Sequence, residues 1–403
     1  MANLITMQTL KMYAPSLTNR GENNEPKSTT VGCIERSRIT SQSIKKATRD
    51  HIRYNSFRSA HLPDLIEKML LQKVEDGSIE EKQVDNLGEI ICKSLCCDYK
   101  NRTSQKKNSK DKDDNVKGNT VINASPAEII AIVNAAVSSN GDAKAIKTAL
   151  DDVRVSLEKA LFGAMTTGGD LETIDGAVSV GHLYGLEEMI PENDFIVASY
   201  QGASVDEGDP FYGSFSTFNE DQKAKTGGET LASSWMYSST MYMKTSVNVK
   251  QLRNNLVSSI TGKKVSIPDT AVSEEMQNAV SDYLRTIATV VPSAKKNSML
   301  TDSFPAICYI ESIKDGVAHY ADPYFEKVIT GTREESVTEQ GIKRMLQYAS
   351  GKKHLQGDVN RYVILDDLYA EYEEAFISAG ITVLHDMDEL ATVVKKEVER
   401  LDV

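Results

Sequence analysis

Segments with the residue pattern of β-strands lie at both ends of this chain, and a helical block separates them. Residues 3–13 and 235–249 are rich in β-branched, aromatic and other apolar residues, and so are the shorter segments 304–314 and 361–367. Residues 62–165 have a helical period instead. Strands from both ends bury their apolar faces most simply in one shared sheet. We therefore expect an α+β fold in which a helical unit is inserted into a sheet domain.

Capping residues place two helices within this block. Ser125 and Glu128 form a capping-box pattern around a proline, which predicts that a helix starts there. Gly141 is expected to end that helix, and Asp142 to cap a second one over residues 143–161. Residues 100–119 contain one aliphatic residue and cannot build a core, so we expect a flexible loop there. Residues 200–230 are rich in Gly, Ser and Asp with scattered aromatic residues, and we expect a protruding hairpin or flap.

Charge is distributed unevenly along the chain. The net charge is −12, yet residues 1–60 carry ten Lys or Arg against four Asp or Glu. The remaining residues carry 36 Lys or Arg against 54 Asp or Glu, a balance of −18. A uniformly acidic surface would repel nucleic acid, whereas a basic strip held apart from the acidic bulk can collect phosphates. The position of the charges therefore points to a polyanionic partner.

The basic residues of this first region are centred on one predicted helix. Thr40 or Ser41 offers an N-cap, and the residues that follow keep a helical period. Helical spacing groups five polar or basic side chains in one arc: Gln42, Lys45, Lys46, Arg49 and Arg53. Arg36 and Arg38 precede the helix, whose free N-terminus would also favour phosphate. A solvated charged face is the alternative reading, but only Asp50 offers an acidic partner within the helix.

Motifs of known active sites are absent from the sequence. It contains no glycine-rich phosphate loop, no His-Glu-x-x-His and no Cys-x-x-Cys pair, and its six histidines are dispersed. The five cysteines are irregularly spaced, which predicts reduced thiols. We therefore expect neither a catalytic residue nor a metal or other cofactor. Without a leader or an apolar run of membrane-spanning length, a cytoplasmic protein without membrane contact is expected.

Six segments, in order over most of residues 1–310, resemble one protein family. They are LTNRGENNEPK (17–27), RSRITSQSIKKATR (36–49), VRVSLEKALFGAM (153–165), TIDGAVSVGH (173–182), SVNVKQLRNNL (246–256) and IATVVPSAKKNS (287–298). Together they resemble the CasC family, which forms the repeated backbone of type I-E CRISPR Cascade complexes. The last ninety residues match no segment of that family and could hold a partner-specific extension.

The resemblance implies a fold similar to a right hand. An RRM-like, or ferredoxin-like, palm would use residues 1–58, 182–196 and 233–403. Helical fingers would be formed by residues 59–181, and a hairpin thumb by residues 197–232. Proteins of this family stack head to tail along a CRISPR RNA. The implied partners are therefore CRISPR RNA, target DNA paired to it, further copies of the chain and other Cascade subunits.

The resemblance also implies which residues contact RNA. Carried over by position, the contacts would be Arg20, Lys27, Arg38, Ser41, Gln42, Lys45, Arg49 and Met165. Met165 would occupy the position from which the family inserts a side chain at a kink in the RNA. Such a protein should grip phosphates and riboses and leave sequence recognition to base pairing, so no catalysis is implied.

Two alternative functions remain open from the sequence. Related backbone subunits of type III complexes cut target RNA with an aspartate in the loop after the first strand. Here that loop offers Glu22, Glu25 and Glu35 but no aspartate. The second alternative is a stand-alone RNA-binding scaffold unrelated to CRISPR.

The charge distribution suggests a contact between copies if they stack head to tail, as the resemblance implies. The acidic surface of one copy would then meet the basic surface of the next.

Overall fold

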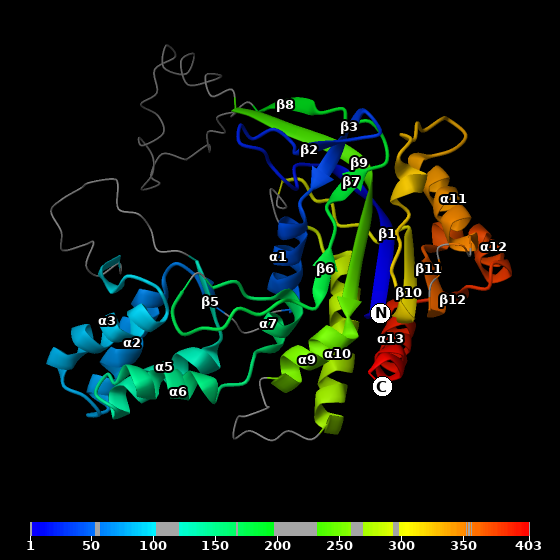
Figure 1. Cartoon of the computed structure of the whole chain (residues 1–403). Helices are drawn as coiled ribbons and strands as arrows, with labels where there is room; N and C mark the ends of the chain where they lie inside the picture. The colour runs from blue at the N-terminus through cyan, green and yellow to red at the C-terminus, as the bar shows by residue number, and fades with distance from the viewer. Residues whose placement is uncertain are drawn as a thin grey trace, which may run out of the picture.

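One large sheet forms the centre of the molecule, and a helical unit lies beside it (Figure 1). The computed structural model describes residues 2–52, 57–101, 121–166, 168–196, 232–258, 269–292, 298–351, 353, 355 and 357–402. The mixture of sheet and helices confirms the predicted α+β class. The predicted thumb, apart from its last residue, and the predicted flexible loop, apart from its first two residues, lie outside the described residues.

The central strand joins distant parts of the chain. β1 (Ala2–Ser16) is antiparallel to β9 (Ala232–Asn248) on one side and to β10 (Ile307–Gly316) on the other. The other strands of this sheet are β2 (Ser28–Val31), β3 (Ile34–Ile39), β6 (Val178–Val180), β7 (Leu183–Gly185), β8 (Glu192–Ile196), β11 (Asp358–Leu365) and β12 (Thr382–Leu384). The order is β12-β11-β10-β1-β9-β7-β3-β2, and β6 and β8 also pair with β9. All four strands expected from the sequence are therefore present, in one shared sheet.

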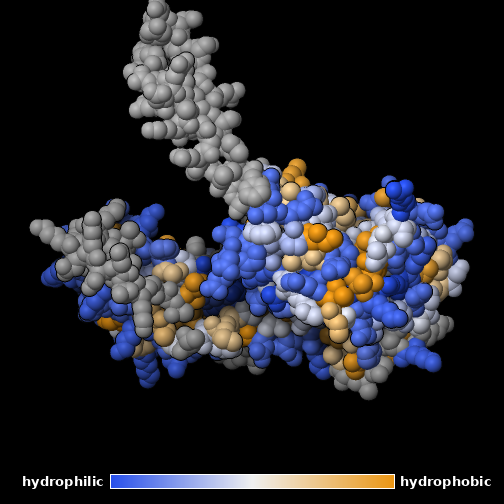
Figure 2. Space-filling view, turned by 90° about the horizontal axis from the view of Figure 1, so that it is seen from above, coloured by the Kyte–Doolittle hydropathy of each residue, from blue (hydrophilic) through white to orange (hydrophobic). Residues whose placement is uncertain are grey.

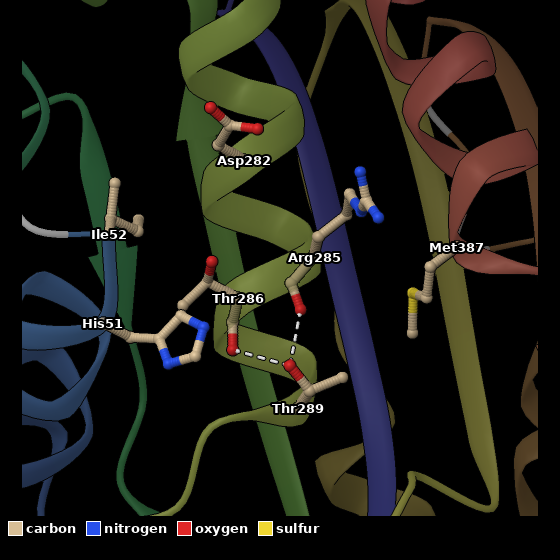
Figure 3. A pocket seen from close by; sticks show the side chains of 7 residues that line it. All are labelled: His51, Ile52, Asp282, Arg285, Thr286, Thr289 and Met387. Carbon is tan, nitrogen blue, oxygen red and sulfur yellow. Dashed lines mark hydrogen bonds between the residues drawn. The ribbon is translucent and has the colours of Figure 1, made fainter.

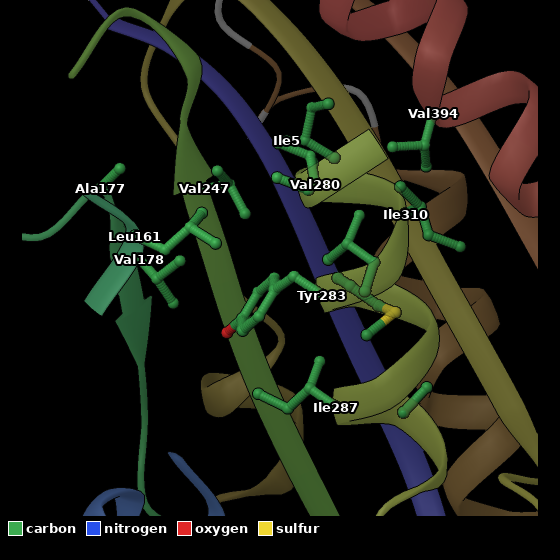
Figure 4. Close-up of a cluster of buried hydrophobic side chains, with 14 of the residues drawn as sticks. Ile5, Leu161, Ala177, Val178, Val247, Val280, Tyr283, Ile287, Ile310 and Val394 are labelled. Carbon is green, nitrogen blue, oxygen red and sulfur yellow. The ribbon is translucent and has the colours of Figure 1, made fainter. Parts of the chain in front are cut away.

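Helices cover both faces of the sheet. One face carries α1 (Ser41–Ile52), α7 (Leu157–Phe162), α9 (Val249–Ser258), α10 (Asp269–Thr289) and α13 (Met387–Leu401). The other face carries α11 (Val337–Ser350) and α12 (Glu373–Ser378). Along β9, Met241 and Met243 enter the first core and Tyr242 the second, as alternation in a strand requires. Figure 4 shows Val247 of β9 and Tyr283 of α10 in the first core.

The helical unit has a third core of its own. It contains α2 (Leu62–Glu75), α3 (Val84–Ser94), α5 (Pro126–Ser138) and α6 (Ala143–Asp151), and the strands β4 (Phe57–Ser59) and β5 (Ile122–Ala124) pair at its edge. Short 3-10 helices occupy Glu81–Gln83 and Tyr99–Asn101 in this unit. Two more, Asp322–Phe325 and Asp367–Tyr372, belong to the sheet domain. Seen from above, hydrophilic residues in blue prevail where this unit meets the sheet domain (Figure 2).

The predicted helix caps are found, but the second predicted helix is divided. Ser125 caps α5 in a complete capping box with Glu128, and Asp142 caps α6. The expected continuous helix over 143–161 is wrong: α6 ends at Asp151, and Ser156 caps a new helix, α7. The two helices are separate because their apolar residues belong to different cores. Those of α6 pack in the core of the helical unit, and those of α7 pack in the first core of the sheet domain.

One other expectation about the sheet needs correction. The segment after β1, read as a loop, contains the hairpin β2–β3, whose turn residues Gly32 and Cys33 have φ of 59° and 67°. Positive φ at both turn positions is typical of the tight turn that matches strand twist. In the last ninety residues, which match none of the six segments, β11 and β12 complete one side of the sheet. In the described part of the chain, no helix has both the length and the apolar character needed to cross a membrane.

Candidate nucleic-acid interface

The predicted basic helix is present and packs through the side opposite its basic arc. α1 begins at Ser41, and its cap is Thr40, whose Oγ1 accepts from the Ser43 amide at 3.4 Å. Ile44 and Thr48 are buried, and Ile44 belongs to the core shared with α10. The opposite arc of α1 is thereby turned away from that core.

The side chains of this outer arc differ in exposure. Gln42 and Lys46 are exposed, and Lys46 pairs with Asp50 one turn later. Lys45 and Arg49 are half-buried, with the Nζ atom of Lys45 lying 3.5 Å from the carbonyl oxygen of Val178. Arg53, assigned to the same arc, lies outside the described residues. The predicted arc is thus partly a solvated surface and partly the wall of a more enclosed site.

A buried carboxylate organises this enclosed part. Glu158 of α7 is 4% exposed, and its Oε1 lies 3.6 Å from Arg49 Nε and 3.0 Å from Arg58 Nε. The Arg49 guanidinium also lies 5.4 Å from the centre of the Phe162 ring, a cation–π contact. Arg58 stands on β4, so helix, strand and α7 meet here. We call Lys45, Arg49, Arg58 and Glu158 the junction cluster.

The junction cluster carries more positive than negative charge among the described residues. Burial lowers the pKa of the Lys45 ammonium, and the charges of Arg49 and Arg58 lower it further. Burial, followed by the charge of Arg58, also lowers the pKa of the Arg49 guanidinium, while Glu158 and Asp50 oppose this shift. Crowded, partly desolvated cations gain most from an incoming anion. The site is therefore suited to bind a phosphate group.

The basic residues of the loop and of β3 lie near the amino end of α1. Arg20 is exposed, and its Nη1 donates to Asn24 Oδ1 at 3.3 Å. It lines a cavity of about 350 Å³ together with Lys46. Lys27 and Arg38 are half-buried and adjacent, because the Lys27 carbonyl accepts from the Arg38 amide at 2.8 Å. The structure therefore places Arg20 beside the outer arc of α1.

Two features expected to attract phosphate are occupied within the protein. Arg36 is fully buried and donates to the carbonyls of Phe325 and Glu326, at 2.8 and 2.6 Å. Those carbonyls end a 3-10 helix, where cations are favoured. The helix N-terminus is not free either, because the Ser41 amide donates to His182 Nδ1 at 2.9 Å. The expectation that Arg36 and a free helix end face a ligand is wrong.

Met165 lies on a loop held against the junction cluster. Its side chain is 86% exposed. Gly163, two residues earlier, has φ of 77°, and a Cβ there would lie 2.8 Å from the Gly176 nitrogen. Arg58 Nη2 donates to the carbonyl of Gly163 at 3.2 Å. The structure therefore holds the loop that carries Met165 against Arg58, although more than a hundred residues separate the two in sequence.

Sequence reasoning missed Arg58 as a member of the site. It follows the periodic segment of α1, so helical spacing assigned it no partner. Only its membership of the basic first sixty residues could have drawn attention to it.

A second cavity, of about 360 Å³, lies between α1, α10 and α13 (Figure 3). It is lined by His51, Ile52, Asp282, Arg285, Thr286, Thr289 and Met387. None of the predicted RNA contacts lines it. Within the described ranges, no group of three or more His, Cys, Asp or Glu side chains is placed to hold a metal ion.

Solved structures with this architecture come from CRISPR assemblies. A chain of a "CRISPR RNA-guided surveillance complex, pre-nicking" aligns with a TM-score of 0.68 at 19% identity, covering 97% of this chain and 100% of that chain. A chain of a "CRISPR RNA-guided surveillance complex" aligns with a TM-score of 0.54 at 16% identity, covering 97% and 99%. At such identities the likeness shows the fold. The chain thus has the fold of subunits found in CRISPR surveillance complexes.

The family follows from the sequence match. The model of the CT1975-like protein family matches residues 5–378, so the chain belongs to that family. The match extends well into the C-terminal region that the six segments did not cover. No curated protein matches the chain.

Proposed function

We propose that this protein binds CRISPR RNA through its sugar–phosphate backbone and forms the repeated backbone of a type I-E Cascade complex, as CasC proteins do. One observation carries this proposal: Arg49 and Arg58 converge on the buried carboxylate of Glu158, Lys45 lies near enough for both charges to lower its pKa, and Arg58 contacts the loop that exposes Met165. The fold shared with subunits of surveillance complexes supports it. In this proposal the sheet domain is an RRM-like palm, the helical unit is the fingers, and residues 197–232 are the thumb.

The predicted contacts include charged side chains that bind phosphate and uncharged side chains that form hydrogen bonds. Lys45 and Arg49 neutralise phosphates from one arc of α1, and Ser41 and Gln42 offer uncharged hydrogen bonds to the backbone. Arg20, Lys27 and Arg38 extend this surface along the amino end of the helix. Met165 projects where it can separate neighbouring bases. Because the protein contacts the phosphates and riboses of the RNA, the bases stay available for pairing with target DNA.

Stacking of copies along the RNA is the second part of the proposal. A head-to-tail contact joins two different surfaces and does not close, so it builds a filament whose length the RNA limits. We expect acidic surface of one copy to face basic surface of the next. Charge reversal of surface Asp and Glu residues should then reduce assembly on RNA, and unchanged assembly would count against this contact.

Co-expression with a CRISPR array tests the proposed function. The purified protein should carry RNA of one uniform length, because each copy covers one segment of a guide of fixed size. Expression without the array is the control and should yield no such RNA. Recovery of RNA of random length would favour a stand-alone RNA-binding scaffold.

We also propose that the assembled protein does not cleave RNA. The experiment is incubation of the assembled complex with complementary RNA and Mg²⁺, followed by analysis of RNA length. Intact RNA is expected. Cuts at regular spacing would favour the nuclease alternative and would direct attention to Glu22, Glu25 and Glu35.

RNA affinity should depend on pH through Lys45. The pKa of this ammonium in the free protein lies below its ordinary value of 10.5. A bound phosphate raises it again, so binding takes up a proton between the two pKa values. Affinity should be complete below the lowered pKa and should fall as pH rises through it. Dissociation constants measured over the alkaline range at constant salt test this.

The matched control for this pH dependence is Lys45→Arg. A guanidinium stays protonated throughout that range, so the decline of affinity with pH should be lost. The same decline in both proteins would show that another group titrates.

A further inference from the structure

Arg58 reaches the junction cluster from a different element than the helix that carries the other two cations. It is the middle residue of β4, and its side chain is 34% exposed. Its Nε faces Glu158 and its Nη2 donates to the carbonyl of Gly163. Neither contact uses the whole guanidinium, which has five N–H donors. Arg58 can therefore exchange its 3.2 Å contact with the Gly163 carbonyl for an anion, while its Nε stays paired with Glu158 at 3.0 Å.

The strand partner of Arg58 is a buried asparagine. In the antiparallel pair of β4 and β5, Arg58 lies directly opposite Asn123. Directly opposed residues of an antiparallel pair project from the same face. The neighbours of Asn123 on β5, Ile122 and Ala124, belong to the core of the helical unit, so Asn123 projects from the face opposite that core. The Asn123 amide thus faces the side on which Arg58 meets α7.

The Asn123 side chain has unused hydrogen-bonding capacity. It is 7% exposed, and neither Nδ2 nor Oδ1 has a partner in the described part of the protein. Leaving a buried amide unpaired costs about 1–3 kcal/mol, so such a group calls for a specific reason. A ribose 2′-hydroxyl is both a donor and an acceptor, which matches the two vacant atoms of the amide.

We propose that Arg58 and Asn123 complete, with Lys45 and Arg49, a pocket for one ribose-phosphate unit of RNA. Arg58 turns from Gly163 to a phosphate oxygen, and this movement opens a route to the amide beside it. Asn123 then pairs with the 2′-hydroxyl and makes the site selective for RNA over DNA. This inference rests on the proposed function and assigns its sugar selectivity to a strand pair outside α1.

The phosphate contact is tested with Arg58→Ala. For a single strand, each lost phosphate contact lowers the slope of log affinity against log salt by about 0.7. We expect that decrease in Arg58→Ala, and in Arg58→Lys we expect the same slope as in the unaltered protein. Arg333→Ala, which removes an exposed arginine, is the control and should leave the slope unchanged. Loss of the Glu158 contact could lower stability by itself, but it would not change the slope. An unchanged slope in Arg58→Ala would overturn the proposal.

The sugar contact is tested with Asn123→Ala. Affinities for RNA and for DNA of the same sequence are compared, because only RNA offers the 2′-hydroxyl. We expect RNA affinity to fall about threefold to tenfold, DNA affinity to stay constant, and the salt slope to remain normal, since one neutral hydrogen bond is lost. Asn134→Ala, an exposed asparagine of the same helical unit, is the matched control.

Stability separates this role from a structural one. Because the amide is unpaired in the free protein, Asn123→Ala should not lower the midpoint of urea unfolding. An unchanged ratio of RNA to DNA affinity would overturn the proposal while leaving the proposed function intact. If the unaltered protein failed to bind RNA at all, the proposed function would be the part that fails.

Discussion

Replacing Lys45 and Arg49 together with alanine is expected to lower the affinity for single-stranded RNA about a hundredfold. Each side chain offers a charge-assisted hydrogen bond to phosphate, worth about tenfold or more in affinity. The slope of log affinity against log salt should fall by about 1.4, since two phosphate contacts are removed. Glu158 keeps Arg58 as a partner in this variant, so the fold should persist. Fluorescence anisotropy titrations over a range of salt concentrations measure both quantities.

A charge-matched control separates local contacts from net charge. Lys395 and Lys396 are exposed on α13, and their replacement with alanine removes the same two positive charges. We expect this control to change affinity by less than about twofold, because isolated surface charges act through a screened field. Equal losses in the two double variants would show that RNA responds to the overall charge, and the assignment of the phosphate site to α1 would be lost.

The sequence predicted those parts of the fold that depend on local pattern. β1, β9, β10 and β11 are apolar enough to be read as strands, and the caps of α1, α5 and α6 follow from side chains next to the helix start. The buried face of α1 was also predictable, because Ile44 and Thr48 share one arc of the helix. These features need no knowledge of distant contacts.

The parts that sequence reasoning missed depend on contacts between distant residues. Arg58 joins the junction cluster through Glu158, one hundred residues later. Asn123 looks like an ordinary polar residue until β5 pairs with β4. The division between α6 and α7 arises because their apolar residues belong to two different cores. Periodicity within one segment cannot report any of these.

The two arginines of β3 illustrate the same limit most sharply. Arg36 and Arg38 are two residues apart, and the sequence pattern treats them alike. Arg36 is buried against carbonyls nearly three hundred residues away, whereas Arg38 is half-buried beside Lys27 at the proposed RNA surface. Identical side chains on one strand thus have different surroundings, and two substitutions can test whether their roles differ as well.

Arg36→Ala is expected to lower the free energy of unfolding by about 3–5 kcal/mol. The variant leaves a cavity in place of a fully buried side chain and removes the donors for the carbonyls of Phe325 and Glu326. Linear extrapolation of urea unfolding measures the loss. The salt slope of RNA binding should not change, because Arg36 reaches no surface.

Arg38→Ala is the matched partner of this experiment and should behave in the opposite way. It removes a half-buried guanidinium at the proposed surface, so stability should change by less than about 1 kcal/mol. The salt slope should fall by about 0.7, as expected for one phosphate contact. A fall in slope for Arg36→Ala without loss of stability would reverse the roles. Arg36 would then act on RNA, as its place in the basic segment first suggested, and its burial against Phe325 would have to open when RNA binds.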